Sequence, residues 1–329
     1  MTDGLDAFYL KPYAAALADK NVIEISVNRP GGFFVEKAGQ AEMEYRPNAA
    51  VTKESIETFA QYIAAKNNQY VNTAKPLFSG TLPTHERIQI VLSPSAAEGG
   101  AISIRKQFVK NISLDEYAKL GAFNNVKPAT AQNALAAQLS RLLDEKNYVA
   151  FIKQAIKSKI SLLISGGTNT GKTTFLNACL REIPAGERII TIEDTRELNP
   201  PQTNVLKLLA SKGDQGTADV TIGDLLEASL RLRPDRILIG ELRGSEAFAF
   251  LRAINTGHPG SMTTVHANDT AGAYQQLELM ALQSAAGKSL SREFLEKYIK
   301  TVMPVVIQLS KRGKERGVEQ IYYKNYQQP

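Results

Sequence analysis

Residues 166–173 read Gly-Gly-Thr-Asn-Thr-Gly-Lys-Thr and match the pattern G-x-x-x-x-G-K-[ST] in full. The apolar run 161–164 (Ser-Leu-Leu-Ile) precedes this stretch, and the residues from Lys172 onward have the pattern of a helix. In such a unit, glycines let backbone N–H groups curl around phosphate oxygens, and the helix N-terminus adds a favourable dipole. Lys172 would reach the β- and γ-phosphates, and the hydroxyl of Thr173 would bind Mg²⁺. The expected nucleotide-binding residues of this loop are Gly166, Gly167, Thr168, Asn169, Thr170, Gly171, Lys172, Thr173 and Thr174.

Acidic residues follow two further apolar runs, at the point where each expected strand ends. Residues 188–192 lead to Glu193 and Asp194, and residues 236–240 lead to Glu241. Because the carboxyl ends of parallel strands face the ligand crevice, we expect these carboxylates beside the phosphates. The alternative is that they only mark the exposed ends of strands.

In enzymes with such a phosphate loop, the strand on the magnesium side usually ends in Asp. Here the corresponding strand ends in Gly240-Glu241. We therefore expect Glu241 to orient the attacking water rather than to hold the metal. Magnesium would then rest on Thr173, on the phosphates, and on Glu193 or Asp194.

Two of the three histidines lie within residues 256–268. His266 follows the expected strand 261–265 at the sheet edge that also carries Glu241, so it is a candidate sensor of the γ-phosphate. A structural role is the alternative, and for His258, in a Gly-Pro turn before that strand, both roles stay open. The expected catalytic residues are Lys172, Glu193, Glu241 and His266.

The first third of the chain mixes helical and strand-like patterns. Expected helices cover residues 5–19 and 54–66, and a capping box at 113–116 predicts a short helix there. Expected strands cover residues 22–27, 33–37, 87–92 and 101–106, the last two as a pair. Residues 121–133 have the composition of a linker, so we expect an N-terminal α+β domain at 1–120 and a second domain at 134–329.

After residue 133, apolar strand-like runs alternate with helical segments. The expected strands are 160–164, 188–193, 236–240 and 261–266, and the expected helices start at 172 or cover 222–232 and 245–255. Short apolar strands separated by helices predict a largely parallel sheet that is covered on both faces. The basic stretch 311–316 follows another strand-length apolar run, 302–309, and we expect it to form a solvated hairpin turn.

The composition is that of a globular protein with about two domains. The chain has 329 residues, 43% of them hydrophobic and 22% charged, with a net charge of +6. One cysteine excludes a disulfide framework and a four-cysteine zinc site. The N-terminus lacks the pattern of a signal peptide, and runs of about 18–20 apolar residues are missing, so we expect a cytoplasmic protein.

In this order, the segments resemble the motifs of the type II/type IV secretion ATPase superfamily. The phosphate loop is followed by the acidic stretch 191–198, by the stretches 232–236 and 240–244, and by the histidine-containing stretch 256–268. The resemblance covers about residues 85–285 and is closest to the Vir-type traffic ATPases of bacterial type IV secretion and conjugation systems.

The resemblance implies an α/β fold, in which an N-terminal α+β domain precedes a RecA-like P-loop NTPase domain with a largely parallel sheet. It implies a homo-hexamer that uses ATP and Mg²⁺ and couples hydrolysis to domain motion, powering assembly of the secretion machine or substrate transfer through it. It also implies arginines on the nucleotide, where Arg87 and Arg105 come from the N-terminal domain and Arg231 comes from the neighbouring subunit. For Arg87 and Arg105, a solvated strand face is the alternative.

The same resemblance implies partners among the inner-membrane components and coupling ATPases of a secretion system. It places the protein in the cytoplasm, peripherally associated with the inner membrane, and the pI of 9.2 is compatible with contact to anionic lipid. We do not expect direct nucleic-acid binding, because the sequence shows no stripe of aromatic and basic residues. Two alternatives stay open at this stage: a type IV pilus assembly or retraction ATPase, and a nucleotide-dependent scaffold with incidental turnover.

Overall fold

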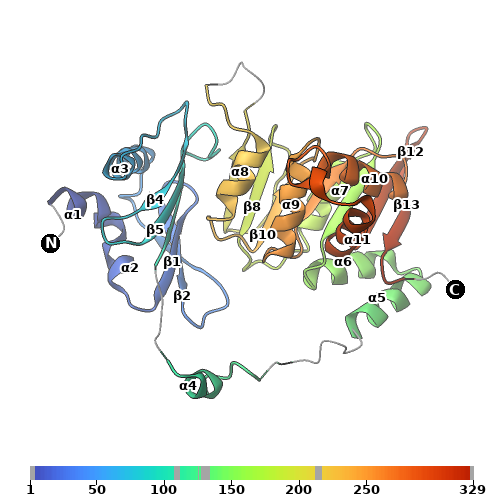
Figure 1. The fold of residues 1–329 in the computed structure, drawn as a ribbon, viewed down its shortest axis with the longest axis horizontal. Coiled ribbons are helices and arrows are strands. Elements are labelled where there is room, and N and C mark those ends of the chain that lie inside the picture. Colours follow the sequence, from blue (N-terminus) through green and yellow to red (C-terminus); the bar gives the residue numbers. More distant parts are fainter. Residues whose placement is uncertain (1–3, 107–111, 125, 127–133, 212–216, 327–329) are drawn as a thin grey trace.

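The computed structural model describes residues 4–106, 112–124, 126, 134–211 and 217–326. Of the expected linker 121–133, residues 125 and 127–133 lie outside the described part. The chain forms two β-sheets, each with helices of its own (Figure 1). Within the described residues, none of the helices has the length and apolar content that crossing a membrane requires.

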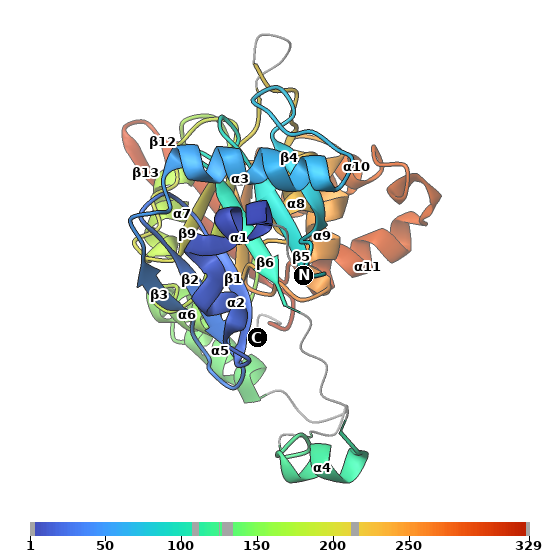
Figure 2. The same cartoon turned by 90° about the vertical axis from the view of Figure 1, so that its left-hand side faces the viewer.

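The N-terminal sheet is antiparallel, with the strand order β3-β2-β1-β6-β5-β4. Its strands are β1 (Val22–Val27), β2 (Gly32–Lys37), β3 (Glu44–Pro47), β4 (Leu77–Thr81), β5 (Arg87–Val91) and β6 (Ala101–Arg105). Three helices lie in front of it in Figure 2: α1 (Gly4–Leu10), α2 (Ala14–Ala18) and α3 (Lys53–Lys66). Their apolar side chains and those of the sheet form one buried cluster, which includes Ile25, Ile56 and Phe59. The expected pair of strands at 87–92 and 101–106 is confirmed as β5 and β6.

The single helix expected at residues 5–19 is wrong. A 3₁₀ turn, η1 (Lys11–Tyr13), separates α1 from α2. Pro12 explains the break, because proline has no backbone N–H to donate and its ring clashes with the carbonyl of the preceding turn. The short helix expected after Ser113 is confirmed as α4 (Leu114–Lys119), where Ser113 and Glu116 form the capping box.

The C-terminal sheet has the order β13-β12-β7-β11-β10-β8-β9 and is parallel except for the antiparallel pair β12–β13. Its strands are β7 (Leu162–Gly166), β8 (Ile189–Glu193), β9 (Val205–Leu209), β10 (Arg236–Ile239), β11 (Met262–Val265), β12 (Val305–Arg312) and β13 (Glu315–Tyr323). Its helices are α5 (Ala134–Asp144), α6 (Tyr148–Lys157), α7 (Lys172–Leu180), α8 (Ile222–Ser229), α9 (Glu246–Asn255), α10 (Thr270–Ala281) and α11 (Arg292–Val302).

Helices cover both faces of this sheet, as the apolar strands predict. In β7, Leu162 and Ile164 pack in a cluster with residues of α5, α6 and α7. Leu163 points to the other face and joins a cluster with residues of α8, α9, α10 and α11. The fold is therefore α/β, and the hairpin turn expected at 311–316 is confirmed between β12 and β13.

Buried and partly buried polar groups connect the two sheets. Arg188 is fully buried, and its Nη1 donates to Oδ1 of Asn28 at 2.6 Å and to Oδ1 of Asn204 at 2.7 Å. Arg233 donates to both carboxylate oxygens of Glu36 on β2, each at 2.7 Å. These contacts fix how the N-terminal sheet lies on the edge of the second one.

Candidate functional site

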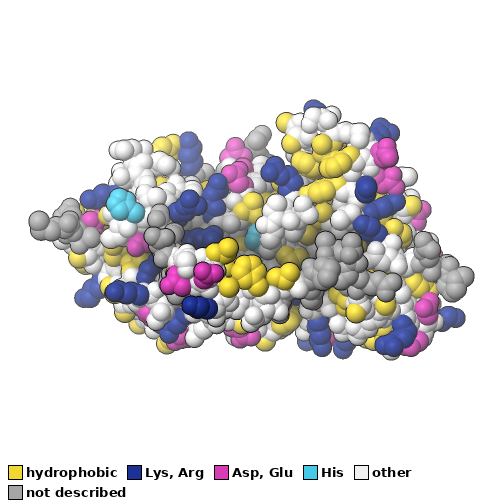
Figure 3. Space-filling model, turned by 60° about the horizontal axis from the view of Figure 1, so that its bottom comes forward, with side chains coloured by type: hydrophobic (Ala, Val, Ile, Leu, Met, Phe, Trp, Pro, Cys, Tyr) yellow, Lys and Arg dark blue, Asp and Glu magenta, His cyan; other side chains and the backbone are white. Residues whose placement is uncertain are grey.

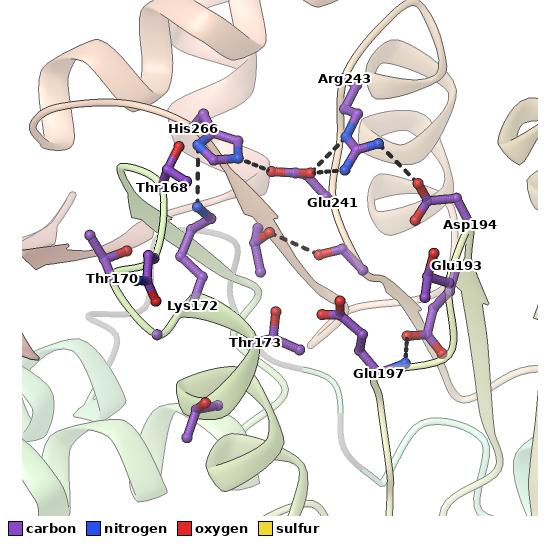
Figure 4. Close-up of a pocket in the computed structure, with 16 residues that line it drawn as sticks. Thr168, Thr170, Lys172, Thr173, Glu193, Asp194, Glu197, Glu241, Arg243 and His266 are labelled. Atoms are coloured by element: carbon purple, nitrogen blue, oxygen red, sulfur yellow. Dashed lines mark hydrogen bonds and ion pairs between the residues drawn. The ribbon is translucent and has the colours of Figure 1, made fainter. Parts of the chain in front are cut away.

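A cavity of about 340 Å³ opens at the carboxyl ends of β7, β8, β10 and β11 (Figure 4). It brings together the phosphate loop, the acids after β8 and β10, and the histidine after β11. Its lining residues are Thr168, Asn169, Thr170, Gly171, Lys172, Thr173, Thr174, Glu193, Asp194, Thr195, Glu197, Gly240, Glu241, Arg243, Thr264 and His266. The topology produces this meeting, since parallel strands end at the same edge of a sheet.

The loop after β7 is a tight turn that only some residue types can form. A Cβ atom on Gly166 would lie 2.5 Å from Oγ1 of Thr170 and 2.8 Å from the carbonyl oxygen of Leu309, so the position requires glycine. Asn169 and Gly171 have φ angles of 62° and 91°, in the left-handed region, and Gly171 caps α7. Such alternation turns successive backbone N–H groups toward one side, which is how phosphate-binding loops are built.

Lys172 lies inside this loop. Its Nζ donates to the carbonyl oxygens of Gly166 at 2.9 Å and of Gly167 at 3.0 Å. Partial burial lowers the pKa of Lys172 from its usual range, and the nearby carboxylate of Glu241 acts in the opposite direction. The ammonium is thus held beside the backbone that would surround the phosphates.

Glu241 is held from two sides. Nε of Arg243 donates to Oε2 of Glu241 at 2.6 Å, and Nη1 of Arg243 donates to Oδ2 of Asp194 at 2.9 Å. Nε2 of His266 lies 2.6 Å from Oε1 of Glu241. The hydrogen bond to Glu241 is the main cause of the raised pKa of Arg243. The carboxylate therefore has a fixed position at the end of β10.

His266 connects the carboxylate to the lysine, because its Nδ1 lies 3.3 Å from Nζ of Lys172. The ammonium of Lys172 can only donate, so Nδ1 accepts, while Nε2 carries the proton and donates to Glu241. The contacts of His266 therefore match a neutral imidazole with its proton on Nε2. Figure 4 shows the resulting line of contacts from Lys172 through His266 and Glu241 to Arg243 and Asp194.

Glu193 lines the cavity, but its carboxylate has other partners. Oε1 of Glu193 accepts the backbone N–H groups of Glu197 and Leu198, each at 2.8 Å. Burial raises the pKa of Glu193 and outweighs these two bonds, which lower it. Glu193 thus shapes the turn after β8, and Asp194 pairs with Arg243, so both predicted magnesium ligands are engaged within the protein.

The described residues include no group of three or more His, Cys, Asp or Glu side chains arranged to hold a metal ion. Mg²⁺ usually keeps several waters and takes one or two protein ligands together with the phosphates of a substrate. Thr173, in the first turn of α7 and on the cavity wall, fits that mode of binding. The donor set therefore suits a magnesium ion that arrives with a nucleotide.

Arg87, Arg105 and Arg231 do not line the phosphate cavity of their own chain. All three line a second cavity of about 430 Å³ between the two sheets, together with Arg233 and Glu24. His258 also lies elsewhere, where its Nδ1 contacts the carbonyl oxygen of Pro234 at 3.1 Å. The resemblance implies that Arg87 and Arg105 reach the nucleotide from the N-terminal domain and Arg231 from the neighbouring subunit, and the structure gathers all three at one place away from the loop.

Residues without a predicted role also line the phosphate cavity, namely Thr195, Glu197, Gly240, Arg243 and Thr264. Arg243 lies within the stretch Gly-Glu-Leu-Arg-Gly at 240–244, so its motif was visible. The role of Arg243 could not be predicted, because nothing in the stretch shows that the guanidinium turns back to Glu241.

The chain is similar to secretion proteins over almost its whole length. A family model described as "Type II/IV secretion system protein" matches residues 10–327. The "Type IV secretion system protein VirB11" of Bartonella quintana is 38% identical, over 97% of this chain and 93% of the relative. The protein of that name from Brucella suis is 34% identical, over 96% of this chain and 89% of the relative.

A solved structure resembles the whole fold. The crystal structure of the VirB11 ATPase from the Brucella suis type IV secretion system, in complex with sulphate, superposes with a TM-score of 0.90 at 32% identity. The match covers 97% of this chain and 99% of that chain. The two-sheet architecture is therefore that of a solved homologue.

Proposed function

This chain belongs to the type II/IV secretion system protein family, and we propose that its phosphate-loop cavity hydrolyses ATP with Glu241 orienting the attacking water. The chain is a type IV secretion ATPase and uses a nucleotide. The observation that carries the site assignment is the meeting of Lys172 and Glu241 in one cavity, where His266 contacts both.

The residues of the cavity have different roles in phosphoryl transfer. Backbone N–H groups of the loop and the ammonium of Lys172 stabilise charge on the β- and γ-phosphates. Arg243 and His266 hold the carboxylate of Glu241 in place before ATP arrives, so little reorganisation is needed at the reaction step. The carboxylate of Glu241 accepts a hydrogen bond from the water and so orients it toward the γ-phosphorus.

We propose that Thr173 holds Mg²⁺ together with phosphate oxygens and waters. When bound, the ion neutralises charge that develops between the β- and γ-phosphates. Glu193 and Asp194 are predicted to act on the ion through waters, because the backbone and Arg243 occupy their nearer oxygens.

Steady-state phosphate release tests the assignment. The purified chain should hydrolyse ATP in Mg²⁺, and Lys172→Ala should abolish turnover. A Lys172→Ala variant that turns over ATP at the parent rate would overturn the assignment. Lys153→Ala, which removes a lysine of α6 that pairs with Glu182, is the matched control and should leave turnover unchanged.

We also propose that the protein assembles as a hexameric ring, in which Arg87, Arg105 and Arg231 act on the nucleotide of a neighbouring subunit. Their shared cavity supports joint action, and their absence from the phosphate cavity of the same chain supports action between subunits. Guanidinium groups suit this role because they are always charged and match phosphate oxygens with paired donors.

Mixing two inactive variants tests this arrangement. Lys172→Ala keeps the three arginines and removes the ammonium of the phosphate loop. Arg231→Ala keeps the phosphate loop intact and removes one arginine. Mixed rings should therefore regain turnover, whereas a mixture of Lys172→Ala with Glu241→Gln should not, because both changes affect the same half of the site.

Light scattering with a non-hydrolysable ATP analogue should give a mass near six times 36.0 kDa. A stable monomer or dimer would contradict the ring.

We propose that residues 1–120 and 134–329 are the two domains, joined through 121–133. Each part has one sheet and a core cluster formed by its own residues alone, which supports the division. We further propose that inner-membrane components and coupling ATPases of the secretion system hold the protein at the cytoplasmic side of the membrane. In Figure 3, Lys and Arg side chains form several separate groups on one face, with Asp and Glu among them, which favours protein partners over lipid. Strong co-sedimentation with anionic vesicles at physiological salt would contradict this preference.

A further inference from the structure

The C-terminal hairpin lies beside the phosphate loop. β12 pairs with β7 in parallel register, and Leu309 is opposite Gly166, where β7 ends and the loop begins. The rest of β12 and the start of β13 therefore continue past the end of β7, next to the loop. This places the turn between the two strands at the edge of the nucleotide site.

Arg316, near the start of β13, contacts the loop with two donors. Its Nε donates to the backbone carbonyl oxygen of Asn169, and its Nη2 donates to Oδ1 of the same residue, both at 2.9 Å. The contact extends to the next constrained position, because a Cβ atom on Gly171 would lie 3.8 Å from Cδ of Arg316. One guanidinium thus covers the outer side of the loop.

The phosphate loop has an unfavourable backbone conformation at Asn169, the residue that Arg316 contacts. Asn169 has a φ of 62°, and residues other than glycine adopt this left-handed region only at a cost in free energy. Asparagine tolerates the region better than most, and its side chain supplies one of the two acceptors for Arg316. The guanidinium bonds both the backbone and the side chain of Asn169, and so favours the conformation that turns the N–H groups inward.

We propose that Arg316 is a positioning residue, which holds the phosphate loop in its phosphate-binding conformation and makes the C-terminal hairpin part of the nucleotide site. This inference rests on the proposed function, since it requires the loop to bind phosphates. Arg316 acts through Asn169. Its loss should therefore weaken nucleotide binding more than it slows the chemical step.

The test measures the Kd for a non-hydrolysable ATP analogue, together with KM and kcat, for the full chain and five variants. Arg316→Ala should raise Kd and KM by about tenfold, as expected for two lost charge-assisted bonds, and leave kcat within about twofold. Arg316→Lys should not restore binding, because an ammonium lacks the planar pair of donors with which the guanidinium matches the two oxygens of Asn169. Lys314→Ala, which removes the same charge from the hairpin turn, should bind like the parent.

A fourth variant, Asn169→Gly, and a fifth, which combines Asn169→Gly with Arg316→Ala, separate positioning from general destabilisation. Glycine adopts the positive φ without strain. In that background, Arg316→Ala should therefore have a smaller effect on Kd than it has in the parent. If the two effects simply add, the coupling is absent and the proposal is wrong.

Other outcomes also decide the matter. Parent-like Kd values for Arg316→Ala, full rescue by Arg316→Lys, or equal weakening by Lys314→Ala would each overturn the positioning role. If Arg316→Ala does not fold, Arg316→Lys keeps the charge and most of the stem, and its Kd decides alone. A parent chain that fails to bind the analogue would instead refute the proposed function, and this inference with it.

Discussion

Nε2 of His266 donates a hydrogen bond to Oε1 of Glu241 at 2.6 Å, which joins the ends of β11 and β10 across the phosphate cavity. The other ring nitrogen accepts from Lys172, so the histidine spans the distance between the phosphate-binding side and the water-orienting side. A sensor of the γ-phosphate needs such a position, because contacts on one side change when the phosphate leaves. Each residue in this line of contacts can be tested separately.

Glu241→Gln should bind ATP like the parent and lose hydrolysis by about a hundredfold or more, since an amide cannot accept as strongly from the attacking water. Glutamine also keeps the size of the side chain, so the cavity should keep its shape. Nucleotide binding by fluorescence and phosphate release measure the two properties independently. Hydrolysis at the parent rate would show that another group orients the water.

His266 should tolerate glutamine better than asparagine. A glutamine amide can place a donor near the position of Nε2 and keep the contact with Glu241, whereas an asparagine amide reaches only the position of Nδ1. We expect His266→Asn to lower kcat by about tenfold to a hundredfold and His266→Gln to lower it less. The opposite order in a kcat comparison would mean that the contact with Lys172 is the important one.

Arg243→Ala should lower kcat by about tenfold and leave KM nearly unchanged, because Arg243 holds Glu241 and Asp194 rather than the loop. Arg243→Lys should not restore the rate, since one ammonium cannot contact both carboxylates with the geometry of a guanidinium. Initial rates over a range of ATP concentrations give both constants. An increase in KM alone would place Arg243 on the nucleotide instead.

The site was predictable where its signals are local in the sequence. The phosphate loop needs particular residues at fixed spacing, and the acids and the histidine directly follow apolar strands, so topology alone brings them together. The partners of Glu193 were not predictable, because a carboxylate after a strand gives no sign that it accepts the N–H groups of Glu197 and Leu198. The contact between Arg316 and Asn169 has no local signal either.

The fold was predictable for the same reason. The prediction failed where strands are short, polar or at the edge of a sheet. β3 (Glu44–Pro47) is a short edge strand without a buried residue, and β13 is exposed over most of its length, so neither shows a clear apolar pattern. The expectations also missed the helices α5, α6, α10 and α11, although α11 carries a local signal, because its buried residues Leu295, Ile299 and Val302 recur at helical spacing. α10 packs on a face of the sheet through Ala273, Leu277 and Ala281, and these tertiary contacts stabilise it.

Glu24 on β1 should make the stability of the protein depend on pH near neutrality. Its side chain is 3% exposed and accepts a hydrogen bond from Oγ of Ser103, and burial is the main cause that raises its pKa from 4.5 to about 7. Between these values the folded chain holds a proton that the unfolded chain has lost, so the free energy of unfolding falls as the pH rises through this window. At about 1.4 kcal/mol per pH unit, the loss amounts to about 3 kcal/mol.

Glu24→Gln removes this dependence, because the amide stays neutral and can still accept from Ser103. Urea unfolding should find the variant and the parent nearly equal at pH 4.5 and the variant more stable by about 2–3 kcal/mol at pH 8. Glu57→Gln on α3, with an exposed side chain, is the matched control and should show a much smaller difference between the two pH values. A stability difference between Glu24→Gln and the parent that does not change with pH would mean that Glu24 is already ionised in the folded chain at pH 4.5, where Arg105 and Arg188 would then outweigh its burial.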